Sequence, residues 1–156
     1  MKVSIEAIKA LRDKTSASLN DVRAALTEAG GDEKKAMALL RKKGASTAAK
    51  RAGRETGQGR VESYVHHDGR IAAIVEINCE TDFVARTPEF TQFCKDIAMH
   101  VAAMGPATVK PGEEDDGEAL LEQAFVKDPG QVIGDILKEL VGKTGENVVI
   151  RRFARF

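Results

Sequence analysis

The sequence predicts an α+β protein, in which an N-terminal three-helix bundle precedes a small antiparallel sheet of about three strands covered by helices. The spacing of apolar residues is helical as far as Gly44 and changes to a period of two at Val61. The charge also changes: residues 1–60 hold 14 Lys and Arg against 7 Asp and Glu, a net of +7, whereas residues 61–156 hold 10 against 17, a net of −7. We therefore expect a bundle over residues 1–44, a basic linker, first helical and then rich in glycine, over 45–60, and a sheet domain over 61–156.

Each of the three N-terminal helices begins at a residue that can cap it. Ser4, Ser18 and Asp32 stand at the three starts, where a hydroxyl or carboxylate accepts a hydrogen bond from a free backbone N–H. Gly30-Gly31 ends the second helix and Gly44 the third. The apolar stripes predicted to form the bundle core are Ile5, Ile8 and Leu11, then Val22, Leu26 and Ala29, then Ala36, Leu39 and Leu40.

A β-hairpin is predicted where the apolar period becomes two. Residues 61–66 alternate, and His67-Asp68-Gly69-Arg70 carries the signal of a two-residue hairpin turn. The returning strand, Ile71 to Ile77, is apolar on both faces, which indicates a central strand that is covered on both sides.

The stretch from Asn78 to Arg86 joins this strand to the next helix and carries an acid beside a large aromatic residue, Asp82 and Phe83. The chain has only seven aromatic residues, and a Phe needed only for packing is more often found inside the flanking strand or helix. Two rigid flanking elements can aim Phe83 outward, as suits a residue that meets a partner. The alternative is that Phe83 folds back as a lid on the following helix.

The rest of the chain contains two helices, a loop and a closing strand. Thr87-Pro88-Glu89 begins a helix that ends at Gly105, with the stripe Phe90, Phe93, Ile97, Ala98 and Val101. Residues 109–117 form a polar, acidic surface loop, and residues 120–126 suit either a strand or a short helix. The last two elements are a helix that Asp128-Pro129 caps and Gly142 ends, and a strand over residues 148–153.

Composition argues against a membrane protein. The chain is 42% hydrophobic and 31% charged, and no apolar run approaches the roughly 18 residues that span a bilayer. The segment from Met1 to Glu6 lacks the apolar region of a signal peptide. Two cysteines, Cys79 and Cys94, in a chain without export features favour a reducing compartment. We expect a cytoplasmic protein with free thiols.

Patterns for catalysis or metal binding are weak. The sequence has no phosphate-binding glycine-rich loop after a strand and no nucleophile elbow. A zinc site from the histidines and cysteines is one alternative, but the adjacent His66 and His67 point to opposite faces of a strand. A nucleophilic Cys79 assisted by His66 is another. We predict no catalytic residue, no cofactor, no bound metal and no covalent catalysis.

The run from Cys79 to Ala85, Cys-Glu-Thr-Asp-Phe-Val-Ala, resembles the signature of elongation factor Ts, the nucleotide exchange factor for the translation GTPase elongation factor Tu. Further segments resemble the family in its own order, and they are Leu11 to Thr15, Lys43 to Ala45, Tyr64 to Asn78 and Gly145 to Arg152. The resemblance covers nearly the whole chain. It implies a ubiquitin-associated-like bundle that docks on the nucleotide domain of the GTPase, followed by a dimerisation-type sheet domain.

The resemblance also implies the residues of the site. Phe83, with Asp82 alongside, would wedge between helices of elongation factor Tu near its Mg²⁺ site, so that Mg²⁺ and then GDP leave. Thr81 and Val84 complete this motif. The further residues that the resemblance implies in partner binding are Leu11, Leu19, Asn20, Arg51, His66 and Gly145.

Three features differ from the family pattern. The turn after the first helix has Ser16, Ser18 and Asn20 where the family has two Gly and a Met. Residues 106–117 are short where relatives carry a helical insertion, and the sheet module occurs once. Short members of this kind are expected to pair as homodimers, which the resemblance therefore implies here.

A second hypothesis assigns the basic tract of residues 41–54 to binding RNA or the ribosome. A solvated helix face followed by a hinge is the simpler interpretation. No aromatic residue lies among these charges for a base to stack on. We therefore expect elongation factor Tu as the partner, and neither nucleic acid nor a membrane.

Overall fold

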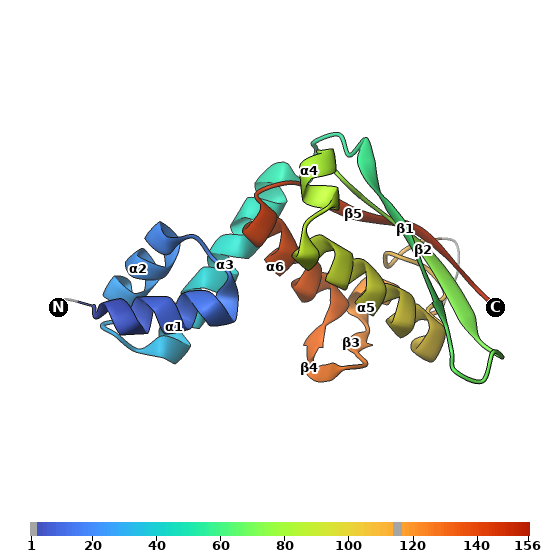
Figure 1. Cartoon of the computed structure of the whole chain (residues 1–156), viewed down its shortest axis with the longest axis horizontal. Helices are drawn as coiled ribbons and strands as arrows, with labels where there is room; N and C mark the ends of the chain where they lie inside the picture. Colours follow the sequence, from blue (N-terminus) through green and yellow to red (C-terminus); the bar gives the residue numbers. More distant parts are fainter. Residues whose placement is uncertain (1–2, 114–116) are drawn as a thin grey trace.

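The computed structural model describes residues 3–113 and 117–156 and has the predicted α+β fold. The molecule is elongated, with its two termini at opposite ends (Figure 1). Three helices come first: α1 (Ile5–Thr15), α2 (Leu19–Glu28) and α3 (Glu33–Arg51). The second part contains, in chain order, β1 (Gln58–Val65), β2 (Ala72–Cys79), α4 (Asp82–Ala85), α5 (Pro88–Met104), the 3₁₀ turn η1 (Leu120–Glu122), β3 (Ala124–Phe125), β4 (Asp128–Val132), α6 (Ile133–Thr144) and β5 (Val148–Arg155).

The predicted caps of the three N-terminal helices are confirmed. Side-chain oxygens of Ser4, Ser18 and Asp32 each accept a hydrogen bond from the backbone N–H three residues further on, at 3.1–3.2 Å. The helices enclose a small core made of Leu11, Val22, Ala25, Leu26 and Ala36. Ile5 was expected in this core, but it stands at the first residue of α1 and is exposed.

Helix α3 does not end at Gly44 as predicted, because it continues to Arg51. Gly44 instead lies against α6, and a Cβ added to Gly142 of that helix would stand 3.0 Å from the Gly44 Cα atom. Glycine on both helices lets the two backbones approach each other closely. The first residues of the expected linker therefore belong to a helix that joins the bundle to the sheet, and only residues 52–57 connect α3 to β1 without regular structure.

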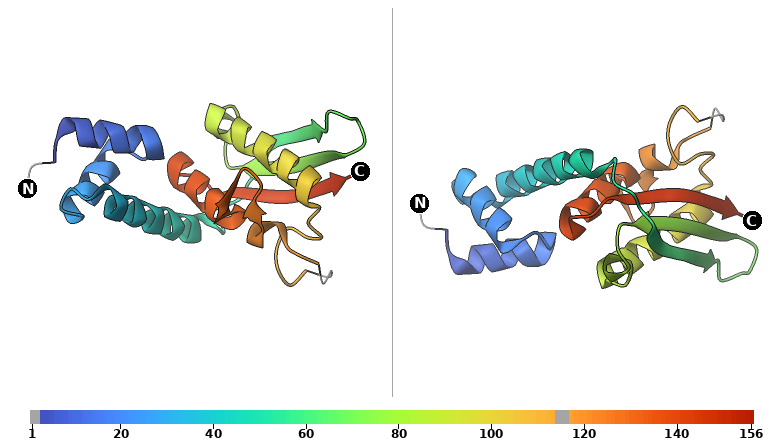
Figure 2. Two further views of the ribbon diagram at one scale, coloured as in Figure 1. Left: turned by 90° about the horizontal axis from the view of Figure 1, so that it is seen from below. Right: turned by 90° about the horizontal axis from the view of Figure 1, so that it is seen from above.

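Strands β1, β2 and β5 form an antiparallel sheet with β2 in the centre, as predicted. Helix α5 covers one face of this sheet (Figure 2). The predicted stripe of α5 is buried there against alternate residues of β2, namely Ala73, Val75, Ile77 and Cys79. The caps of α5 are also confirmed, because Thr87 accepts from the Phe90 N–H at 3.3 Å and Gly105 ends the helix with φ +56°.

The prediction that β2 is covered on both faces is wrong for the described residues. The face turned away from α5 carries no other element, and from above the strands lie in front of the helices (Figure 2). Its large apolar side chains are exposed, and they are Val61, Val65, Ile74 and Phe156. A strand can be central in its sheet and still leave one face to solvent or to a partner.

The loop between β1 and β2 is longer than the two residues predicted. The last strand pair is Val65 with Ala72, and beyond it the His66 N–H donates to the Ile71 carbonyl at 2.8 Å. Gly69 takes φ +70° inside this loop, a conformation that favours glycine. The glycine therefore marks the loop but does not make it a two-residue turn.

The helix expected from Asp128-Pro129 begins later and ends later. The Asp128 carboxylate accepts from the backbone N–H of Gly130 at 3.3 Å and from Nε2 of Gln131 at 2.6 Å. It thus bonds within strand β4 instead of capping a helix. Helix α6 starts at Ile133, passes Gly142 and ends at Gly145, where φ is +71°.

Residues 120–126 contain both alternatives left open by the sequence, since η1 is followed by strand β3. Of the acidic loop expected over residues 109–117, Glu114, Asp115 and Asp116 lie outside the described residues, as do Met1 and Lys2 at the start. Within the described ranges, no helix has both the length and the apolar character that a membrane crossing needs.

Candidate functional site

The stretch after β2 forms a one-turn helix, α4, rather than an irregular turn. Thr81 caps this helix, because its Oγ1 atom accepts a hydrogen bond from the Val84 N–H at 3.4 Å. Phe83 is 79% exposed, so the alternative in which it folds back as a lid is excluded. The strand before and the long helix after α4 hold this exposed aromatic ring on a fixed base.

The four residues of the Thr-Asp-Phe-Val motif point in different directions. Val84 is partly buried and packs against the main hydrophobic core. Asp82 is half-exposed, and its carboxylate forms an ion pair with Arg86 at 3.1 Å. Since an exposed pair of this kind contributes little to stability, Asp82 can exchange Arg86 for another partner at small cost. Phe83 and Thr81 are thus the exposed residues of the motif, and the half-exposed Asp82 lies between them in the chain.

The loop between α6 and β5 braces the motif. The Glu146 carboxylate accepts from both the backbone N–H of Thr81, at 2.9 Å, and its hydroxyl. In the opposite direction, the Glu80 carboxylate accepts from the Asn147 N–H at 2.7 Å. This hydrogen bond, ahead of the nearby Arg54 and Arg51 guanidinium groups, lowers the pKa of Glu80.

Sequence reasoning missed Glu80, Glu146 and Asn147 as residues of the site. In the loop before the last strand, the sequence singles out Gly145, through the family resemblance, but neither Glu146 nor Asn147. Its one usable signal was an acid next to an amide in a short loop, which does not say which distant backbone it will meet. Sixty-five residues separate Glu146 from Thr81.

Cys79 lies directly beneath the motif and donates its thiol proton to the Thr81 carbonyl at 3.1 Å. Burial, together with the neighbouring Glu146 carboxylate, raises the pKa of Cys79 to about 11, and burial raises that of Cys94 to about 12. Both thiols therefore stay protonated near neutral pH, which argues against a nucleophilic cysteine.

His66 does not meet Cys79 or the motif. It follows the end of β1 at which Val65 pairs with Ala72, whereas Cys79 pairs with Gln58 at the other end. Strand geometry puts these ends about 20 Å apart. Within the described ranges, no three His, Cys, Asp or Glu side chains are grouped so that they could hold a metal ion.

The other predicted partner-binding residues are spread over the molecule. Gly145 begins the bracing loop, and Arg51 ends α3 close enough to Glu80 to affect its pKa. Leu19 is 54% exposed at the start of α2, and Asn20 beside it is also exposed. Leu11 is only 1% exposed, so its role is in the core of the bundle and not on a docking surface.

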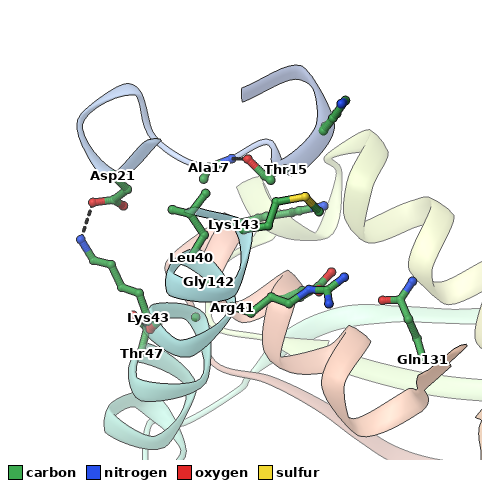
Figure 3. A pocket seen from close by; sticks show the side chains of 14 residues that line it. Thr15, Ala17, Asp21, Leu40, Arg41, Lys43, Thr47, Gln131, Gly142 and Lys143 are labelled. Atoms are coloured by element: carbon green, nitrogen blue, oxygen red, sulfur yellow. Dashed lines mark hydrogen bonds and ion pairs between the residues drawn. The ribbon is translucent and has the colours of Figure 1, made fainter. Parts of the chain in front are cut away.

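The basic tract over residues 41–54 is partly neutralised. Arg41 pairs with Glu139 at 3.3 Å, Lys43 with Asp21, and Arg54 with Glu80 at 3.4 Å. Near it a hollow of about 270 Å³ lies between the bundle and α6, with Leu40 and Met37 in its wall and the Lys43–Asp21 pair beside it (Figure 3). Through these three ion pairs, three of the six cations of the basic tract already have a carboxylate partner.

Comparison with known proteins gives consistent results. A family model described as Elongation factor TS matches residues 2–118 and 80–156. The chain is 44% identical to elongation factor Ts of Rubrobacter xylanophilus, covering all of this chain and 99% of that protein. It is 43% identical to elongation factor Ts of Solidesulfovibrio magneticus, over 98% of this chain and 95% of that protein. It is 41% identical to elongation factor Ts of Caldanaerobacter subterraneus, over 99% of this chain and 96% of that protein.

These matches place this chain, with its α+β fold and its braced, exposed aromatic turn, in the class of translation elongation factors. Within that class, the chain belongs to the elongation factor Ts family. The alignment with the Rubrobacter protein extends over 193 positions, against 156 residues in this chain, so that relative has residues without a counterpart here.

Proposed function

We propose that this protein is a guanine-nucleotide exchange factor for elongation factor Tu and acts in the cytoplasm during protein synthesis. The observation that carries the proposal is Phe83, 79% exposed on a capped and braced turn in a chain of the elongation factor Ts family. A single large apolar side chain held away from its own core is suited to enter a pocket of another protein.

In the proposed mechanism the Phe83 ring enters between helices of elongation factor Tu near its Mg²⁺ site, with Asp82 beside it. Mg²⁺ requires nearly ideal octahedral geometry, so a small displacement of its ligands weakens binding strongly. In GTPases of this kind the ion bridges nucleotide phosphates and protein side chains, so loss of the ion removes a main contact between the nucleotide and the protein. Mg²⁺ departs first and GDP follows.

This mechanism needs only binding energy and no covalent step. A factor that weakens nucleotide binding must itself be bound more weakly when nucleotide is present, because coupling between two ligands is reciprocal. Rebinding of GTP therefore expels the factor. Burial of one Phe side chain contributes about 2–3 kcal/mol, a useful part of such a coupling.

The bundle serves, in this proposal, as a second docking module, with residues 1–44 as the bundle, 45–60 as the connection and 61–156 as the core domain. Exposed Leu19 and Asn20 offer a contact surface at the start of α2. Arg51, His66 and Gly145 remain proposed contacts of the connection and the core domain. Because α3 is one helix from Glu33 to Arg51, the bundle is joined to the core by a stiff element rather than by a flexible linker.

We also propose that two copies of the chain associate through the face of the sheet that α5 leaves uncovered. Val61, Val65, Ile74 and Phe156 are exposed there. The Glu76 carboxylate beside them already pairs with Arg152 at 2.6 Å and with Arg151 at 3.4 Å, so the patch meets a second copy without an unpaired acid. The rationale is that exposed apolar side chains gathered on one face mark an interaction surface.

The experiment that tests the exchange proposal measures release of a fluorescent GDP analogue from elongation factor Tu. Phe83→Ala is expected to lower the stimulated release rate by about 30- to 150-fold, which corresponds to the loss of about 2–3 kcal/mol. Its thermal stability should stay close to wild type, because the ring has little contact with its own chain.

Met104→Ala is the matched control, since Met104 is also a large exposed apolar residue but lies at the end of α5. It should stimulate release like wild type. If Phe83→Ala stimulates release as well as the wild-type protein, the role of Phe83 is wrong. RNA binding through residues 41–54 is the alternative, and salt-sensitive RNA retention that is lost when Lys50, Arg51 and Arg54 are neutralised would favour it instead.

A further inference from the structure

Helix α4 has few interactions of its own to hold it in place. It is four residues long, and none of its residues is fully buried. The first four N–H groups of any helix lack a partner within the helix, so a single turn depends on groups outside it. Only Val84 and Ala85 pack against the main core. The direction of Phe83 is therefore set by hydrogen bonds at both ends of α4: those at its start, and those at its end, where the Val84 carbonyl accepts from the N–H and the hydroxyl of Thr87 at 3.0 and 2.9 Å.

Glu146 occupies the key position among the hydrogen bonds at the start of α4. Its two carboxylate oxygens accept from the N–H and the hydroxyl of Thr81. Because the hydroxyl proton is directed to Glu146, a lone pair of the same Thr81 oxygen is left to accept from the Val84 N–H and cap the helix. An ionised acceptor makes such bonds shorter and stronger than a neutral one.

The brace is reciprocal and reaches a third segment. Glu80 accepts from the Asn147 N–H at 2.7 Å, so each of the two loops donates a backbone N–H to a carboxylate of the other. The Asn147 side-chain amide donates to the Arg54 carbonyl at 2.8 Å, and the Arg54 guanidinium lies 3.4 Å from the Glu80 carboxylate. The segment after α3, the motif and the loop before β5 are thus joined by polar contacts.

We infer that Glu146 is a positioning residue for the aromatic turn: through Thr81 its carboxylate fixes α4, and thereby the direction in which Phe83 is presented to the partner. The inference rests on the proposed function and adds a residue outside the Thr-Asp-Phe-Val motif to it. Glu146 itself need not touch the partner. Its effect on exchange passes entirely through the turn.

Amide hydrogen exchange of the free protein tests the positioning directly. In Glu146→Ala, the peptide that covers residues 81–87 should exchange about tenfold faster or more, while peptides of α5 keep wild-type rates. Glu146→Gln should fall between the two, since an amide oxygen can still accept from the Thr81 N–H but the amide nitrogen cannot accept its hydroxyl proton. Asp135→Ala, which removes an exposed carboxylate from α6, is the control and should leave these rates unchanged.

A double-mutant cycle then connects positioning to exchange. Glu146→Ala should lower the maximal rate of GDP release at saturating factor about tenfold, and should have no further effect in a Phe83→Ala background. Wild-type hydrogen exchange over residues 81–87 in Glu146→Ala would overturn the inference, as would additive effects of the two substitutions. If the turn loosens as expected but neither substitution changes GDP release, Glu146 still positions the turn and the proposed function is what fails.

Discussion

At the scale of single residues, the fold restricts the protonation of His100. It is fully buried on α5, and its Nδ1 atom accepts from the Val126 N–H at 3.2 Å. Nδ1 is therefore unprotonated, and Nε2 must donate to the Gln123 side-chain oxygen at 2.9 Å. Gln123 in turn donates to the Glu118 carboxylate at 3.2 Å. The neutral ring thus joins α5 to the segment that carries η1 and β3.

Burial lowers the pKa of His100, and this outweighs the opposing effects of Gln123 and Glu118. In the unfolded chain the imidazole takes up a proton near its usual pKa of 6.5, whereas the native protein does so only at lower pH. The unfolded state therefore binds more protons below pH 6.5, and the free energy of unfolding falls as the pH falls.

Urea unfolding at pH 7.5, 6.5 and 5.5 measures this dependence. The wild-type free energy of unfolding should decrease below pH 6.5 by up to about 1.4 kcal/mol per pH unit. His100→Gln keeps a donor and an acceptor but lacks the group that takes up the proton, so its free energy of unfolding should decrease less. The other two histidines are the same in both proteins, so the difference between the two slopes reports on His100. Equal slopes for the two proteins would show that His100 is not the responsible group.

Residue-level prediction from sequence succeeded where the partner is close in the chain. Ser4, Ser18, Asp32 and Thr87 were predicted as caps because each bonds to a backbone N–H three residues away. The contact of Glu146 with Thr81 spans 65 residues and depends on how β2 and β5 pair. No local pattern encodes such a contact, so the bracing residues of the candidate site could not be found from sequence alone.

At the scale of elements, the crossing of α3 and α6 shows why helix ends were harder to predict than helix starts. Gly44 and Gly142 both look like terminators in sequence, yet each lies inside a helix. Their value is tertiary: the absence of a Cβ permits the close approach of two backbones. Gly105 and Gly145, which do end helices, have positive φ, and the sequence does not distinguish the two uses.

Substitution of the two glycines should therefore have opposite results. Gly142→Leu places a side chain against the Gly44 backbone, where even a Cβ would lie 3.0 Å from Cα, and should destabilise the protein by about 1–3 kcal/mol. Gly44→Ala is the matched control, because its Cβ would lie 3.7 Å from the Lys138 carbonyl, an ordinary contact. It should be neutral or stabilising by up to about 1 kcal/mol, since alanine favours a helix interior over glycine.

Thermal and urea unfolding of both variants provide the measurement. Gly142→Leu should also become more susceptible to proteolysis within residues 45–57, because α3 loses its support on α6. Wild-type stability of Gly142→Leu would mean that the helices can separate at no cost, and the packing explanation of the two glycines would then be incorrect.

At the scale of the whole molecule, the main feature without a function in the single chain is the uncovered face of the sheet. Cross-strand neighbours on this face are Ile74 with Ser63 and Ala154, flanked by exposed Val61 and Val65. A second copy presents the same patch, and a two-fold axis would place apolar residues of one sheet against those of the other. Sheet-on-sheet packing of this kind is a common way to bury such faces.

Ile74→Glu tests this proposal, because it places a charge at the centre of the patch on a side chain that is 43% exposed in the single chain. Light scattering coupled to size-exclusion chromatography should give the mass of two chains for wild type and of one chain for the variant. The variant should lose less than about 1 kcal/mol of monomer stability, the range of strand propensities. Ile5→Glu, an equal change at a 78% exposed site on α1, should remain dimeric.

A wild-type protein that elutes with the mass of one chain at tens of micromolar, or an Ile74→Glu variant that stays paired, would contradict association through this face. Phe83 lies beyond the Cys79 end of β2, whereas Ile74 is nearer the hairpin end. The monomeric variant should therefore still stimulate GDP release from elongation factor Tu if each copy engages its own GTPase. A loss of release together with pairing would instead show that the exchange unit is the dimer.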